Sequence, residues 1–141
     1  MTFDLGGLNW LAIIVGAAIY FILGALWYSP PLFARPWQAA IGWDDSRPEP
    51  QTNPLTYVIP AVLYLVAGVA TASIAKATGT DTLTEGITLG LITGIGFAVP
   101  MVGVEATFDP NKPKPMTWFL ITAAYHLIGF LILAIAVAVW V

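Results

Sequence analysis

Long apolar stretches alternate with short polar ones along this chain. Four stretches contain no Asp, Glu, Lys or Arg, and they lie between Asp4 and Arg35, between Glu49 and Lys76, between Glu85 and Glu105, and after Lys114 as far as Val141. A membrane-crossing helix needs about 20 mostly apolar residues, and a charge at the bilayer centre costs at least about 2.5–3.5 kcal/mol. The pattern therefore predicts four transmembrane helices, at about residues 8–28, 56–77, 83–105 and 116–141.

Local signals support these boundaries. Pro30 and Pro31 follow the first stretch, and proline has no N–H to continue a helix. Thr82 and Glu85 have the spacing of a capping box, which favours a helix start. Pro100 is expected to bend the last third of the third helix.

The segment between the first two helices divides into two parts. Residues 32–42 are short and amphipathic, with Phe33, Trp37 and Ile41 at four-residue spacing, which predicts a short helix in the membrane interface. An irregular loop anchored by Trp37 is the alternative. Residues 43–54 carry several charges and prolines and are expected to form a polar linker.

Composition agrees with a membrane protein. Of the 141 residues, 58% are hydrophobic and 9% are charged, against about 25% charged in soluble domains. The expected fold is therefore all-α, a single integral membrane bundle of four transmembrane helices with a short interfacial helix after the first. The net charge of −3 forms no tail and gives no case for nucleic-acid binding, and the absence of cysteine excludes thiolate sites. No cofactor is indicated.

Aromatic and basic residues predict how the chain sits in the bilayer. Indole rings prefer the headgroup level, and all six tryptophans fall at predicted helix ends or in the interfacial segment: Trp10, Trp27, Trp37, Trp43, Trp118 and Trp140. Loops one and three together carry Arg35, Arg47, Lys112 and Lys114, whereas the other side carries only Lys76. The positive-inside rule then predicts that these two loops lie on the cytoplasmic side of the cell membrane and both termini on the opposite, extracytoplasmic side. Dual topology is the alternative.

Small residues predict how the helices associate. Helix contacts in lipid depend on close packing and interhelical hydrogen bonds. Gly86, Gly90 and Gly94 repeat at four-residue spacing and form a ridge on the third helix. The ridge packs either within the monomer or against another copy, and the small bundle is expected to form a homo-oligomer surrounded by membrane lipid.

One group of residues suggests a binding pocket. His126 is the only histidine, and it lies about ten residues into the fourth helix, hence about 15 Å deep. Thr122, Tyr125 and His126 lie on one stripe of this helix, and Tyr20, Tyr28 and Tyr64 lie on the first two helices. An ionisable residue at this depth suggests a functional site. The alternative is a neutral histidine hydrogen-bonded across helices to Tyr20, Tyr64 or Thr93.

Glu105 is the second ionisable candidate. It ends the predicted third helix and either points into the bundle, as part of the pocket, or pairs with Lys112 or Lys114 at the membrane surface. One histidine and one marginal glutamate do not form a catalytic set or a metal site. We therefore expect no enzyme activity, no catalytic residue and no bound metal.

Several motifs together resemble one known family. They are Asn9-Trp10 at the start of the first helix, the run from Gly24 to Pro30 at its end, Phe33, Trp37 and Gly42 after it, the glycine-rich third helix ending in Glu105, and Thr122-Ala-Ala-Tyr125-His126. This combination is similar to the bacterial membrane family called domain of unknown function 1761. The resemblance implies a small four-helix membrane protein and implies no activity, substrate or catalytic residue.

Three functions follow as hypotheses. The first is a protein that binds or passes a small, unidentified molecule through the intramembrane pocket. The second is a structural or accessory subunit that acts through helix packing and oligomerisation. The third, an enzyme that uses His126 and Glu105 as acid and base, has the least support. Proton-coupled drug export is disfavoured, because the first helix contains no carboxylate.

Overall fold

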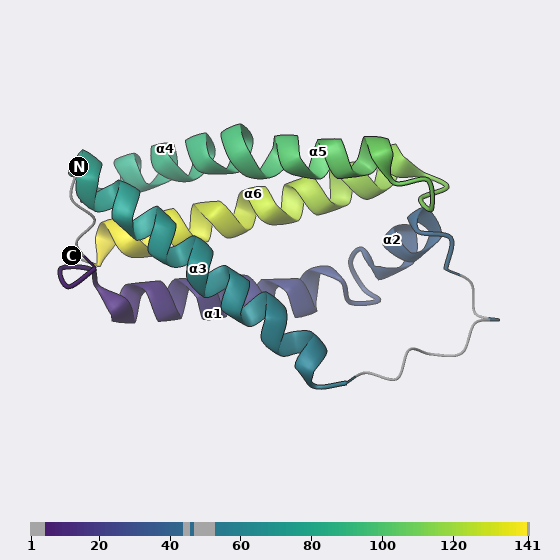
Figure 1. Cartoon of the computed structure of the whole chain (residues 1–141), viewed down its shortest axis with the longest axis horizontal. Helices are drawn as coiled ribbons and strands as arrows, with labels where there is room; N and C mark the ends of the chain where they lie inside the picture. The colour runs from purple at the N-terminus through teal and green to yellow at the C-terminus, as the bar shows by residue number, and fades with distance from the viewer. Residues whose placement is uncertain (1–4, 44–45, 47–52, 141) are drawn as a thin grey trace.

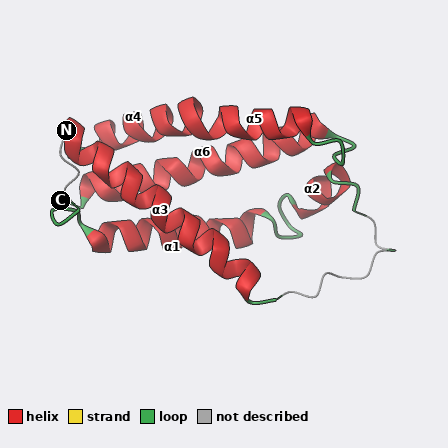
Figure 2. Cartoon of the chain, viewed as in Figure 1, coloured by secondary structure: helices red, strands yellow, loops and turns green. Residues whose placement is uncertain are grey.

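The computed structural model describes residues 5–43, 46 and 53–140. These residues form helices and loops, with no strand among them (Figure 2). The order along the chain is α1 (Trp10–Trp27), α2 (Ala34–Ala40), α3 (Leu55–Thr78), α4 (Leu83–Thr93), a π-helical turn η1 (Gly94–Ala98), α5 (Val99–Phe108) and α6 (Pro115–Val139). Since α4, η1 and α5 run on as one rod, four helices are long and apolar enough to cross a membrane, as expected. Most of the predicted 43–54 linker lies outside the described residues.

The last helix is the centre of the bundle. α6 contacts every other helix. In its most apolar 18-residue segment 44% of the residues are buried, against 22–28% in the corresponding segments of the other three candidate spans. α1 lies along one side of α6 and the α4–α5 rod along another (Figure 1). α6 therefore supplies most of the surface on which the other helices pack.

The glycine ridge of α4 and η1 packs within the monomer. A Cβ on Gly90 would lie 2.7 Å from the Leu131 Cα of α6, and one on Gly86 would lie 2.8 Å from the Ala138 Cβ. One on Gly94 would lie 2.6 Å from the Leu127 side chain. The two helices approach this closely only because the three positions lack side chains.

The helix ends follow the local sequence. The Asn9 side chain caps α1 by accepting the Ala12 N–H at 3.0 Å. The predicted capping box is present, since Thr82 and Glu85 each accept a backbone N–H of the other. Gly79 ends α3 in the left-handed conformation at φ 67°, which suits a residue without a side chain.

The irregularity expected from Pro100 lies just before that residue. Proline cannot donate to the carbonyl four residues earlier and its ring crowds that carbonyl. The chain widens into the π turn of η1, in which the Val99 N–H bonds to the Gly94 carbonyl. The predicted third helix also continues past Glu105 to Phe108.

The expected interfacial helix is present, but it packs on the bundle. Ala34 and Ala40 of α2 are buried, and Trp37 and Ile41 pack against a cluster that contains Trp118. The Lys114 N–H donates to the Ala40 carbonyl at 3.3 Å, which joins loop three to α2. Loops one and three therefore share one end of the molecule, while the Asn9 side chain donates to the Trp140 carbonyl at the other (Figure 1).

One helix leaves part of the bundle uncovered. α3 crosses α6 and α1 diagonally, and its N-terminal end projects away from both (Figure 1). Residues 55–59 at that end are all exposed, whereas Gly68, Thr71, Ala72 and Ala75 further along are buried. The half of α6 that is nearer to α2 is therefore less covered by α3 than the half nearer to the termini.

Candidate functional site

Four of the five tyrosines meet the single histidine inside the bundle. Tyr20 and Tyr28 come from α1 and its end, Tyr64 from α3, and Tyr125 and His126 from α6. We call these five residues the tyrosine–histidine cluster. His126 lies 11 residues after the start of α6, which is about 16 Å along the helix and near the middle of a bilayer core. The structure therefore brings together five of the seven residues predicted to line a pocket.

Hydrogen bonds connect three helices through this cluster. The Tyr20 hydroxyl lies 2.5 Å from His126 Nδ1. The Tyr125 hydroxyl donates to the Tyr64 hydroxyl at 2.8 Å and lies 3.3 Å from the Tyr20 carbonyl. The contact between Tyr20 and His126 is the interhelical hydrogen bond that the alternative for His126 predicted, with Tyr20 as the partner.

The rings pack directly against one another. Tyr20 stacks on Tyr64 with ring centroids 4.2 Å apart, and Tyr125 meets Tyr28 at 5.4 Å. Tyr28 in turn contacts Trp37 of α2 at 5.3 Å. The centre of the predicted pocket is therefore filled by its own side chains, and a ligand can reach only its edge.

Thr122 lies at that edge with an unpaired hydroxyl. The residue is 7% exposed, and its Oγ1 has no hydrogen-bond partner among the described residues. The Tyr28 hydroxyl lies close enough to interact with the Thr122 hydroxyl and is its nearest candidate partner. A buried polar group left without a partner costs about 1–3 kcal/mol, and such groups often mark a missing water or ligand.

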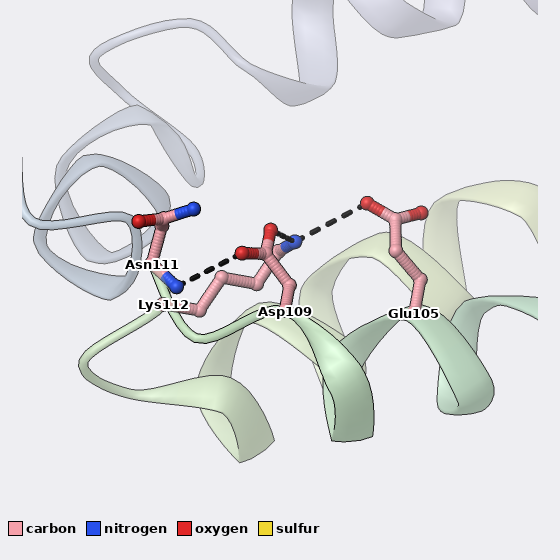
Figure 3. A network of polar contacts seen from close by, with 4 residues as sticks. All are labelled: Glu105, Asp109, Asn111 and Lys112. Carbon is pink, nitrogen blue, oxygen red and sulfur yellow. Dashed lines mark hydrogen bonds and ion pairs between the residues drawn. The ribbon is translucent and has the colours of Figure 1, made fainter.

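Glu105 does not join the cluster, which corrects the expectation that it lines the pocket. Its side chain is 59% exposed and pairs with Lys112 at 3.2 Å, because α5 continues for another turn and turns back at Asp109 (Figure 3). Lys112 also pairs with Asp109, and its ammonium lies 4.1 Å from the centre of the Trp118 ring. The carboxylate therefore pairs within loop three and takes no part in the tyrosine–histidine cluster.

This loop network makes stability depend on pH. Hydrogen bonds from the Lys112 ammonium and from the Asn111 N–H hold the pKa of Asp109 below its ordinary value of 3.8. Because the native pKa is the lower one, the stabilisation is present above the ordinary value and is lost as pH falls through the native value. We expect wild type to be more stable than Asp109→Asn near pH 7, and the difference to shrink towards about pH 3.

Unfolding in detergent at the two pH values, followed by circular dichroism, measures that difference. Asn111→Ala is a control, because the contact to Asp109 uses the Asn111 backbone N–H and survives the change. An equal difference at both pH values would contradict an ionised Asp109 as the centre of the network.

The tryptophans divide into two groups. Trp10 and Trp140 are 48% and 42% exposed at the helix ends, as lipid-facing anchors would be. Trp118 is only 6% exposed, and Trp27 donates its indole N–H to the Ile121 carbonyl at 3.1 Å. Trp118 therefore packs inside the bundle, where its ring is covered by α2, α5 and Lys112.

Three open grooves are lined by residues outside the cluster. One of about 310 Å³ between α1 and α3 is lined by apolar residues that include Ile14, Phe21 and Leu65. A second of about 320 Å³ lies between α5 and α6, around Gly103 and Phe119. A third of about 200 Å³ lies near the termini, around Asn9 and Trp140. None of these three is lined by a residue of the cluster.

Two features of the site were not evident from sequence. The Tyr20 ring lies against Gly129, where a Cβ would be 2.0 Å from ring atoms. The Tyr125 hydroxyl similarly occupies the space above Gly24, 2.8 Å from where a Cβ would be. Gly129 follows Tyr125 and His126 at helical spacing on the same face of α6, but such spacing does not identify the partner helix.

The cluster lacks a metal-binding set. Within the described ranges, no group of three or more His, Asp or Glu side chains comes together. One family model, described as protein of unknown function (DUF1761), matches residues 11–138. No curated protein and no solved structure matches the chain.

Proposed function

Because the chain belongs to the DUF1761 family of proteins of unknown function, we propose a function from the site itself. The protein binds a small molecule inside the membrane, at the edge of the tyrosine–histidine cluster, and does not act as an enzyme. It lies in the cell membrane with loops one and three in the cytoplasm and both termini outside. Arg35 and Lys114 at the α2 end support this orientation.

The buried hydroxyl of Thr122 carries this proposal. Water is scarce in the hydrocarbon core, so a polar group there needs a partner from the protein or from a ligand. Thr122 Oγ1 finds none among the described residues, although four tyrosine hydroxyls and an imidazole lie on the same part of the bundle. A small molecule bound beside it supplies the missing hydrogen bond.

A structural or accessory role is the second candidate, and the packing favours it. The Tyr20–His126 and Tyr125–Tyr64 contacts tie α1, α3 and α6 together without any ligand. The α4 ridge is already occupied by α6, so a homo-oligomer would have to use another surface. The exposed N-terminal half of α3 is available for such a contact.

Native mass spectrometry from mild detergent separates the two candidates. It reads the oligomer mass and any retained small molecule in one measurement. Under the binding proposal, wild type retains a small molecule and His126→Ala releases it. Under the structural alternative, His126→Ala only lowers stability, by about 0.6 kcal/mol, as for one interhelical hydrogen bond.

The matched control is Thr71→Val. Thr71 is 1% exposed on α3, and its hydroxyl donates to the Ala67 carbonyl in its own helix and not to a residue of the cluster. We expect this variant to retain the ligand. Wild type that is bare after mild extraction, with His126→Ala changed only in stability, would favour the structural role.

A further inference from the structure

The short helix α2 is attached differently at its two ends. At its start, the backbone N–H groups of residues 32–34 donate to the carbonyls of Trp27 and Ser29, at and just after the end of α1. At its far end, the bond to another part of the described chain runs from the Lys114 N–H of loop three to the Ala40 carbonyl, at 3.3 Å. The start of α2 is therefore anchored to α1, whereas its far end depends on loop three.

Lys112 connects that part of loop three with the bundle. Its ammonium pairs with Glu105 of α5 at 3.2 Å and with Asp109, and its side chain is only 6% exposed (Figure 3). The same ammonium lies 4.1 Å from the centre of the Trp118 ring of α6. Lys114, which bonds to α2, follows two residues later. The contacts of one side chain therefore join α5, α6 and the loop segment that bonds to α2.

The apolar face of α2 has two possible partners. Phe33, Trp37 and Ile41 lie on one side of the helix, while Arg35 and Gln38 are exposed. A short helix of this kind also binds at the membrane interface, with its apolar side chains at the boundary of the acyl chains. α2 lies at that level, since it follows directly after a candidate span. Leaving the bundle would therefore not put its apolar face into water.

In its packed position α2 covers one end of the tyrosine–histidine cluster. Trp37 lies against the Tyr28 ring with centroids 5.3 Å apart, and the Tyr28 hydroxyl lies beside Thr122. Trp37 also packs on the group of residues around Trp118. None of the three open grooves is lined by a residue of the cluster. Movement of α2 away from the bundle would take Trp37 off Tyr28 and expose this edge of the cluster.

We infer that α2 is a lid over the tyrosine–histidine cluster. It pivots at its Ala34 end, lifts at its Ala40 end from Trp118 into the membrane interface, and is held closed by Lys112 through the bond from Lys114. This inference rests on the proposed intramembrane binding site and adds how access to that site is controlled. Movement of the lid is measured without a ligand, so the two proposals succeed or fail separately.

Thiol labelling of the full chain in lipid nanodiscs tests the lid. The chain contains no cysteine, so a single introduced thiol reports on its own position. Ala40→Cys lies at a position that is 0% exposed at the lifting end, Ala34→Cys at one that is 8% exposed at the pivot, and Ala39→Cys on the exposed side as the matched control. The reagent is N-ethylmaleimide, which reaches both water and the membrane interface, and intact mass spectrometry follows the reaction at one pH.

We expect Ala39→Cys to react fastest and Ala40→Cys slowly. Addition of Lys112→Met, which keeps an apolar chain over Trp118 but removes the charge, should speed the reaction of Ala40→Cys about tenfold, which corresponds to about 1.4 kcal/mol in the opening equilibrium. The rates of Ala34→Cys and Ala39→Cys should not change. Lys112→Arg, which keeps the charge, should leave Ala40→Cys slow.

Three results would overturn the lid. One is an Ala40→Cys rate that Lys112→Met does not change, and another is a rate equal to that of Ala39→Cys without any change at Lys112. The third is an equal acceleration of Ala34→Cys, because the whole helix then leaves the bundle and does not pivot. If circular dichroism shows that Ala40→Cys is misfolded, Ile41→Cys, which packs on the same group around Trp118, replaces it with the same expectation. Each of these results leaves the proposed ligand binding to be decided by native mass spectrometry.

Discussion

Replacement of Gly129 by alanine is expected to destabilise the protein by about 3 kcal/mol, the largest effect of any single methyl group in the described structure. A Cβ at this position would lie 2.0 Å from Cε2 and Cζ of Tyr20. The ring cannot easily move away, because it is 1% exposed, stacks on Tyr64 and is hydrogen-bonded to His126. The added methyl group must therefore separate α1 from α6.

Reversible unfolding in mixed micelles, followed by tryptophan fluorescence, measures this loss. Gly96→Ala is the matched control, since a Cβ there meets nothing within 4 Å and alanine is the better helix former. We expect the control to be as stable as wild type or slightly more stable. If the two variants were equally stable, Tyr20 would not be packed against Gly129 as described.

Replacement of Gly90 by alanine should cost the next largest amount, about 2 kcal/mol. A Cβ at Gly90 would lie 2.7 Å from the Leu131 Cα and 3.2 Å from its backbone nitrogen. A backbone atom cannot turn aside as a side chain can, so α4 and α6 would have to separate along the whole ridge. Gly86 and Gly94 would then lose their contacts with α6 as well.

The control for this change is Gly103→Ala on the same rod. Its Cβ would lie 3.4 Å from the Phe119 ring, which is ordinary contact. The same unfolding measurement should show a clear loss for Gly90→Ala and little change for Gly103→Ala. A Gly90→Ala variant that unfolds like wild type but changes its oligomer mass would instead place the ridge at a contact between copies.

The sequence predicted much of the candidate site. Five of the seven predicted pocket residues meet, because tyrosines and a histidine in apolar helices must find polar partners inside the bundle. Thr122 lies beside them, on the predicted stripe. Of the two alternatives for Glu105, the structure shows the pairing with Lys112 and not the place in the pocket, a choice that depends on the turn between them, whose geometry the sequence pattern does not give.

The tryptophan prediction shows a similar limit. Position at a helix end was correct for Trp118, but position does not say whether a ring faces lipid or protein. α2 packs over that ring, and only the fold of the first loop against α5 and α6 decides this. Because of the same packing, α2 lies over one end of the bundle and is not a free helix in the membrane interface.

The sequence by itself determined the four helices long and apolar enough to span a membrane, the capping box at Thr82 and Glu85, the shared side of loops one and three, and the residues available for polar contacts between the helices. These follow from local rules, since hydrophobic length, glycine, proline and capping residues act within a few positions. Tertiary structure alone decided that α6 is the central helix, that the Gly86–Gly94 ridge packs inside the monomer, and that Tyr20 bonds to His126. Those outcomes depend on which helix faces fit together, and close packing between helices joins residues as far apart as Tyr20 and Gly129.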